Sequence, residues 1–85
     1  MKVDMTALQP TIDAADLGPL LGLEPSKVPE KMRSGDITSR FETGEGEDAG
    51  RVRFTFYHEG LRVRLTCDTD GTVISTSRSP VKPRP

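Results

Sequence analysis

Residues 51–75 read RVRFTFYHEGLRVRLTCDTDGTVIS. Apolar and polar residues alternate on both sides of Glu59-Gly60, and this period of two is typical of strands that are buried on one face only. The stretch therefore predicts part of an antiparallel β-meander with one face exposed to water. It indicates a fold more clearly than it indicates a chemistry.

A two-residue loop at Glu59-Gly60 separates the two faces of the first hairpin. The apolar pairs are then Phe56–Val63, Phe54–Leu65 and Val52–Cys67, and the other face receives Tyr57–Arg62, Thr55–Arg64, Arg53–Thr66 and Arg51–Asp68. A three-residue loop would set Phe56 against Arg62 and mix the faces. The second turn leaves two alternatives open, a two-residue loop at Asp70-Gly71 or a bulged turn, which differ in whether Val73 or Ile74 points inward.

Two short helices are predicted before the sheet. The first has Asp13 as N-cap and Gly22 after its end, although Pro19 would also allow a later start with Asp16 as cap. The second begins at Ser26 as N-cap and ends at Gly35. Residues 37–43 then form the first strand of the meander.

The predicted fold class is α+β, with two short N-terminal helices packed on one face of a three- to four-stranded antiparallel β-meander. Residues 1–10 form a weakly ordered segment or an edge strand, 11–76 the single domain, and 77–85 a disordered, basic, proline-rich tail. The expected core comprises Leu17, Leu20, Leu21, Leu23, Val28, Met32, Ile37, Phe41, Val52, Phe54, Phe56, Val63, Leu65 and Cys67.

Length and composition limit the possible functions. At 85 residues, 33% of them hydrophobic, the chain has a small core, and we expect self-association or a protein partner to stabilise it. A formal charge of −1 argues against a general coat for nucleic acid. A single cysteine, no apolar N-terminal segment and no membrane-length apolar run predict a cytoplasmic protein without a membrane partner.

The polar face of the sheet provides the candidate binding residues. They are Arg40, Arg51, Arg53, Arg62, Arg64 and Tyr57. Arginine forks hold phosphates or carboxylates, which predicts a non-catalytic binding or regulatory module for a protein or an anionic partner. The alternative is a solvated face on which Arg51 and Arg53 are balanced by Glu42, Asp68 and an acidic loop.

The helix pair supports a second hypothesis. Gly18, Gly22 and Val28 have the spacing of a helix-turn-helix, and the segment resembles excisionase-like DNA-binding proteins, whose second helix enters the major groove. DNA contacts would then come from Lys27, Lys31 and Arg33. However, Lys31 occupies a normally apolar position and Pro29 shortens the second helix, so the helices could instead simply cover the sheet.

We expect no metal, no cofactor and no catalysis. The carboxylates of Glu45, Glu47 and Asp48 do not have the spacing of a calcium loop. His58 is the only histidine, and it lacks both a second metal ligand and a nucleophile to activate.

Residues 32–42, 44–51 and 53–56 together resemble a family of small bacterial proteins, mostly alphaproteobacterial, that is carried as a domain of unknown function. Residues 13–17, 21–23 and 70–73 fit as well, so the resemblance covers roughly residues 11–78. It implies a bacterial, cytosolic, single-domain protein. It brings no activity with it, and both ends of the chain lie outside it.

Overall fold

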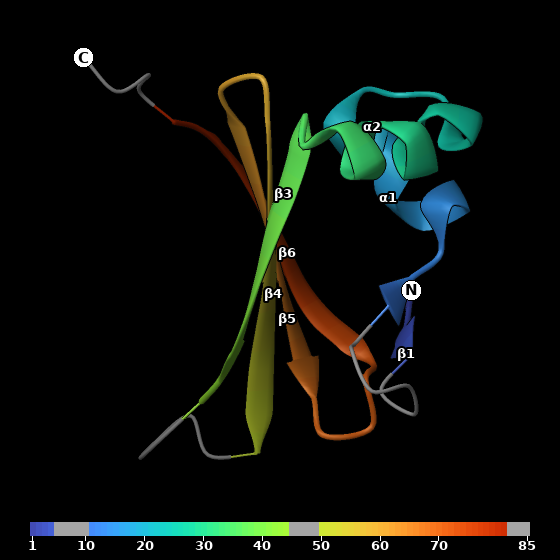
Figure 1. Cartoon of the computed structure of the whole chain (residues 1–85). Coiled ribbons are helices and arrows are strands. Elements are labelled where there is room, and N and C mark those ends of the chain that lie inside the picture. Colours follow the sequence, from blue (N-terminus) through green and yellow to red (C-terminus); the bar gives the residue numbers. More distant parts are fainter. Residues whose placement is uncertain (5–10, 45–49, 82–85) are drawn as a thin grey trace.

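The computed structural model describes residues 1–4, 11–44 and 50–81. A four-stranded antiparallel sheet forms one layer, and two helices with a short two-stranded ribbon lie on one side of it (Figure 1). In chain order the elements are β1 (Val3–Asp4), β2 (Thr11–Ile12), α1 (Ala14–Leu21), the 3₁₀ turn η1 (Pro25–Lys27), α2 (Val28–Ser34), β3 (Ile37–Thr43), β4 (Arg51–His58), β5 (Leu61–Asp68) and β6 (Val73–Pro80). The α+β class is confirmed. Among the described helices, none has the length and apolar character of a membrane span.

The four strands follow one another across the sheet in the order β3-β4-β5-β6. The β4–β5 hairpin has the predicted register, with Phe56 opposite Val63 and Tyr57 opposite Arg62. Its loop is the two-residue turn, because both Glu59 (φ 45°) and Gly60 (φ 77°) have the positive φ angles that such a turn requires.

A register shift between Thr66 and Cys67 decides between the two alternatives for the second turn, and the turn is the bulged one, with Val73 pointing inward. Cys67 lies opposite Val73, which is half-buried, whereas Ile74 is 49% exposed. Carboxylates hold the turn: Asp68 Oδ1 accepts hydrogen bonds from the backbone N–H groups of Asp70 and Thr72, both at 3.1 Å. Two main causes hold the pKa of Asp70 far below its ordinary value: the larger is hydrogen bonding with the Asp68 side chain, and the smaller is hydrogen bonding with Thr72.

Helix α1 begins at Ala14, so the first of the two predicted starts is correct. Asp13 is the N-cap and accepts a hydrogen bond from Ala15 N at 2.9 Å, and Gly22 ends the helix in the left-handed conformation. The predicted second helix is divided: residues 25–27 form η1, and α2 starts only at Val28. Ser26 is therefore not an α-helical N-cap, and the prediction was wrong at this point.

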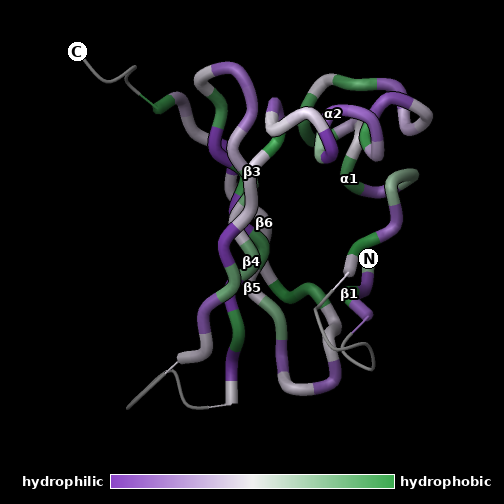
Figure 2. The backbone as a smooth tube through the Cα atoms, viewed as in Figure 1, coloured by the Kyte–Doolittle hydropathy of each residue, from purple (hydrophilic) through white to green (hydrophobic). Residues whose placement is uncertain are grey.

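The core lies between the helices and the sheet. Its buried hydrophobic residues are Val3, Leu17, Leu21, Val28, Ile37, Val52, Phe54, Phe56, Val63, Leu65 and Cys67. Figure 2 shows hydrophobic and hydrophilic residues alternating along the strands, as expected for a sheet with one covered face. Three predicted core residues, Leu20, Leu23 and Phe41, are only partly buried against this cluster.

Met32 was wrongly predicted to be a core residue, because its side chain is 39% exposed. Only the first turn of α2, at Val28, is buried, so the next residue on the same helix face lies outside the core. Val3, in contrast, belongs to the core but was not among the predicted core residues. It is fully buried because the N-terminal segment pairs with the second turn, where Val3 N donates to Gly71 O at 2.8 Å.

The predicted disordered tail was also wrong at its start. Residues 77–80 continue β6, with Ser77 opposite Arg64 and Ser79 opposite Arg62. Val81 N donates to Gly60 O at 2.8 Å. Hydrogen bonds alternate along an antiparallel pair, so the backbone N–H and C=O groups of the odd-numbered residues in this part of β6 point toward β5. The backbone of Pro80 points to the open edge, where the missing N–H of a proline is tolerated. Residues 82–85 and 5–10, on which the remaining end predictions fall, lie outside the described residues.

Candidate functional site

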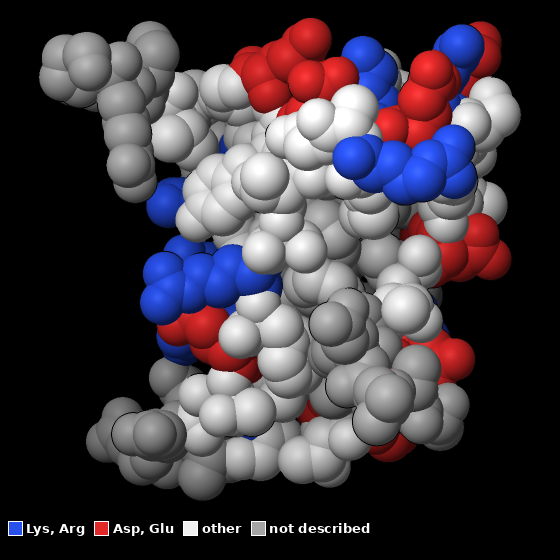
Figure 3. Space-filling view, in the orientation of Figure 1, with Lys and Arg blue, Asp and Glu red and all other residues white. Residues whose placement is uncertain are grey.

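The outer face is the side of the sheet that points away from the helices. All six predicted binding residues lie on it: Arg40 on β3, Arg51, Arg53 and Tyr57 on β4, and Arg62 and Arg64 on β5. No described helix or strand packs over this face (Figure 1). Figure 3 shows basic side chains beside acidic ones on the side of the molecule opposite the helices, and further basic and acidic side chains over the helices. The structure therefore brings the predicted arginines together on one exposed surface.

Positive charge exceeds negative charge on the outer face. Its carboxylates are Glu42, which lies opposite Arg53, and Asp68, which lies opposite Arg51. Glu42 also pairs with Arg40, at 3.5 Å between Oε1 and Nε. The side chains of Arg40 and Glu42 are 70% and 46% exposed, so water and salt weaken this pair. Among the described residues of this face, two carboxylates stand against five arginines, a surplus of three positive charges.

One residue at the centre of the outer face is buried. Thr55 is only 2% exposed although no described element covers it. It lies between Arg40 on one neighbouring strand and Arg64 on the other. Arginine stems pack along a surface while their charged heads stay near water, which explains the burial of the threonine. The Nε atom of Arg64 is buried and has no hydrogen-bond partner among the described residues, so this guanidinium retains an unused donor there.

A hollow of about 520 Å³ opens on the outer face beside these arginines, and we call it the arginine hollow. It is lined by Thr38, Arg40, Tyr57, Arg62 and Val81. Thr38, Tyr57 and Arg62 lie side by side on three neighbouring strands. Arg62 Nη2 donates a hydrogen bond to Ser79 Oγ at 3.2 Å, which holds the guanidinium in place. The hollow thus presents two cationic forks on either side of a tyrosine.

A family comparison adds to this geometry. A model of the family of unknown function DUF6522 matches residues 1–85. The chain belongs to this family. No curated protein and no solved structure matches it. The DUF6522 match includes both ends of the chain, which the resemblance seen in the sequence had left outside.

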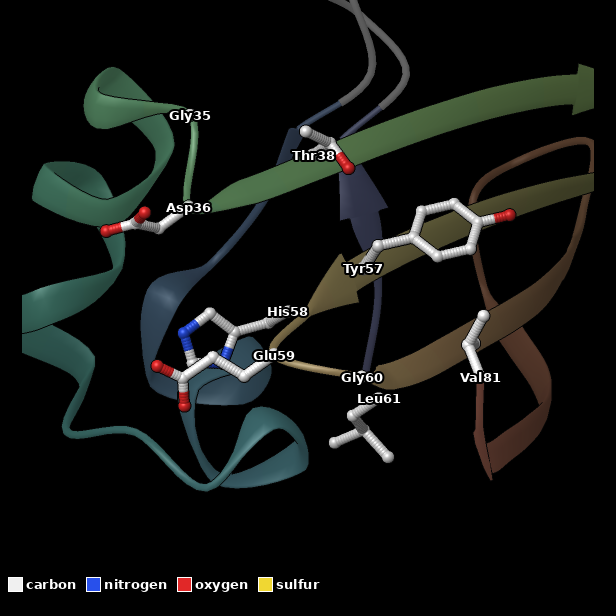
Figure 4. A pocket seen from close by; sticks show the side chains of 9 residues that line it. All are labelled: Gly35, Asp36, Thr38, Tyr57, His58, Glu59, Gly60, Leu61 and Val81. Carbon is white, nitrogen blue, oxygen red and sulfur yellow. The ribbon is translucent and has the colours of Figure 1, made fainter. Parts of the chain in front are cut away.

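A smaller hollow, of about 280 Å³, lies at the adjacent end of the DUF6522 sheet (Figure 4). It shares Thr38, Tyr57 and Val81 with the arginine hollow and adds Asp36 and His58, among others. Figure 4 shows Tyr57 and His58 pointing to opposite sides of β4, with His58 on the helix side. His58 is 6% exposed, and its Nε2 atom finds no hydrogen-bond partner in the part of the chain that the structure describes. Within the described residues, no group of three or more His, Cys, Asp or Glu side chains is placed to hold a metal ion.

The three candidate DNA contacts of this DUF6522 protein lie away from the arginine hollow, at and after η1. Lys27 ends η1, and Lys31 and Arg33 lie in the last turn of α2. Lys31 Nζ is 3.6 Å from Asp36 Oδ2, so an ion pair partly neutralises it. Gly18 has a packing role, because a Cβ atom there would lie 2.8 Å from Leu23 O. A close turn between the two helices is enough to explain this glycine.

Two contributors to the arginine hollow were missed by sequence reasoning. Val81 lines it and Ser79 holds Arg62, yet both fall in the segment that was predicted to be a disordered tail. A signal was available: Ser75, Ser77 and Ser79 continue a period of two, with Thr76 and Arg78 between them. Serine and proline carry little strand propensity, which hid the pattern.

Proposed function

We propose that this DUF6522 protein is a non-catalytic binding module, and that its arginine hollow holds a phosphate or carboxylate group of an anionic partner. The observation that carries the proposal is the pair Arg40 and Arg62 on either side of Tyr57 in a hollow on a face with surplus positive charge. A planar guanidinium donates two parallel hydrogen bonds to such anions, which a point charge cannot do.

The arrangement of the side chains favours binding over a merely solvated surface. Arg62 is held by Ser79, and Arg64 is half-buried over the sheet. Side chains that are already ordered lose less conformational entropy when a ligand arrives. The unpartnered Nε of Arg64 is a buried donor that an incoming oxygen would satisfy after a small movement of the side chain.

The residues of the arginine hollow support binding rather than catalysis. Arginine stays protonated in proteins and cannot act as a general base. Thr38 and Tyr57 contribute hydroxyl groups, but the described lining of this hollow holds no carboxylate, histidine or cysteine to activate them. The chemistry on offer is therefore hydrogen-bond donation and a flat aromatic surface.

The test is a titration of the ¹⁵N-labelled full chain with inorganic pyrophosphate, followed by NMR, with arginine side-chain signals included. We expect saturable shifts at Arg40, Tyr57, Arg62 and Arg64. Arg62→Gln should weaken pyrophosphate binding roughly tenfold, since a hydrogen bond to a charged group is worth about 1.5–3 kcal/mol. The matched control is Arg33→Gln, an equal change of charge at an exposed position on α2.

Equal losses of affinity in Arg62→Gln and Arg33→Gln would contradict the proposal, because they would reflect net charge alone. A parallel titration with a short mixed-sequence DNA duplex tests the alternative. Shifts confined to Lys27, Lys31 and Arg33 that weaken steeply with salt would favour DNA binding through α2.

A further inference from the structure

Strand β3 is one of the two edges of the sheet, and its outer side is unpaired within the described residues. Gly44 N donates to Arg51 O at 2.8 Å. Hydrogen-bonded pairs alternate along an antiparallel ladder, so the backbone groups of Thr38, Arg40 and Glu42 face β4. Those of Ser39, Phe41 and Thr43 therefore point away from the sheet. An edge of this kind is a template for one more strand.

The opposite edge, β6, is protected in two places. Its start is covered by the N-terminus, where Lys2 bridges to Thr72 and Val73 N donates to Met1 O at 3.1 Å. Its end carries Pro80, which has no N–H to offer. Within residues 1–4, 11–44 and 50–81, strand β3 has neither protection. Instead it carries two opposite charges, Arg40 and Glu42, on either side of the half-buried Phe41.

We propose that β3 pairs with β3 of a second copy of this chain, antiparallel and with the two-fold axis at Phe41. Residues directly opposite each other in an antiparallel pair point to the same side of the sheet. This register places Arg40 opposite Glu42 of the second copy, and Glu42 opposite Arg40 of the second copy. The charge pattern of β3 is thus complementary to itself.

Other registers lose this complementarity. An axis at Arg40 places the two Arg40 side chains opposite each other, and an axis at Glu42 places the two Glu42 carboxylates opposite each other. Both registers are unfavourable because like charges directly opposite each other repel. An axis at Ser39 leaves Arg40 opposite Thr38. An axis between two residues places inward residues opposite outward ones, which a sheet with one covered face does not tolerate.

The backbone and the apolar side both fit the same register. Phe41 directs its N–H and C=O outward, so the two Phe41 residues would form a hydrogen-bonded pair. The Arg40–Glu42 pairs would then be non-hydrogen-bonded pairs, in which the side chains lie closer together. On the inner side, Phe41 packs edge-on against Phe54, with ring centroids 5.7 Å apart. A second Phe41 would extend this aromatic row and cover its exposed end. Such a self-complementary contact is what a two-fold dimer requires.

The first test is sedimentation equilibrium of the full chain over a wide concentration range. A single edge contact is small, and we expect a dimer with a dissociation constant of roughly micromolar to hundreds of micromolar. Arg40→Glu alone and Glu42→Arg alone each place like charges across the edge and should weaken self-association at least about tenfold. Mixed in equal amounts, the two variants should pair with each other, because the acidic strand of one faces the basic strand of the other.

Two proline variants separate the edges. Ser39→Pro removes an outward N–H without breaking the ladder to β4, and should abolish the dimer. The matched control is Thr76→Pro, which removes the corresponding outward N–H on β6 and should leave the dimer intact. All four positions are exposed, and an NMR spectrum of each variant checks that it folds.

The proposal would be overturned by a wild-type chain that is monomeric at every concentration, by charge variants that self-associate like the wild type, or by a mixture that forms no heterodimer. Loss of the dimer in Thr76→Pro would move the contact to β6 and overturn it as well. Arg62 and Arg64 lie outside β3. Their variants therefore test anion binding separately from this interface.

Discussion

The two faces of the β4–β5 hairpin come from the same two strands, one residue apart, yet they are held differently. On the inner face, Phe56, Val63 and Leu65 are completely buried. On the outer face, Tyr57, Arg62 and Arg64 remain half-buried. Inner side chains stabilise the fold by leaving water, which needs no specific geometry beyond close packing. Outer side chains contribute less to stability, and at Arg64 a buried donor, Nε, is left without an acceptor among the described residues.

The largest expected contrast is between two adjacent residues of β4. Phe56→Ala should lower the free energy of unfolding by about 3–5 kcal/mol, because it leaves a cavity at a fully buried position. Tyr57→Ala removes an aromatic ring of similar size from the other face and should cost about 1–2 kcal/mol, since that ring is only half-buried. Urea unfolding measures both. Equal losses would show that the outer face is as important to the fold as the inner one.

A smaller difference in stability is expected between variants of two adjacent residues near the end of β5, Cys67 and Thr66. Cys67→Ser places a hydroxyl at a fully buried site and should cost about 1–3 kcal/mol unless it finds an acceptor. Thr66→Ser on the outer face should stay within about 0.5 kcal/mol. Burial first, and the charge of Asp68 second, raise the pKa of the Cys67 thiol, so alkylation by iodoacetamide should be slow until the chain unfolds. Rapid alkylation of the folded chain would mean that this end of the sheet opens.

The sequence was sufficient to predict which residues of β4 and β5 lie on each face of the sheet. It was not sufficient to predict how far β6 extends or that Val3 is buried. Alternation around Glu59-Gly60 predicted the hairpin register, because a half-buried pair of strands allows only one arrangement. Strand β6 shows no such alternation of apolar residues. As an edge strand it is mostly exposed, so serines suit it and resemble a loop. Val3 is buried through pairing with residues about 70 positions later in the chain, and no local pattern reports such a contact.

The same limits apply to the candidate site. The arginines were placed on one face correctly, because the period of two in β4 and β5 assigns each of them a side. The arginine hollow itself was not predictable, since it also needs Val81 and the hydrogen bond from Arg62 to Ser79. Both belong to the segment whose order depends on pairing with β5.

The smallest change in stability is expected for Arg64→Met. Methionine keeps an unbranched stem that can still cover Thr55, and the substitution removes a buried Nε that has no partner, so the free energy of unfolding should change by no more than about 0.5 kcal/mol. Affinity for pyrophosphate should nevertheless fall several-fold, because a donor beside the arginine hollow is lost. Arg33→Met on α2 is the matched control for both measurements. If Arg64→Met instead lowers stability by more than about 2 kcal/mol while pyrophosphate binding is unchanged, the guanidinium holds the sheet together, and the outer face has no donor kept in reserve for a partner.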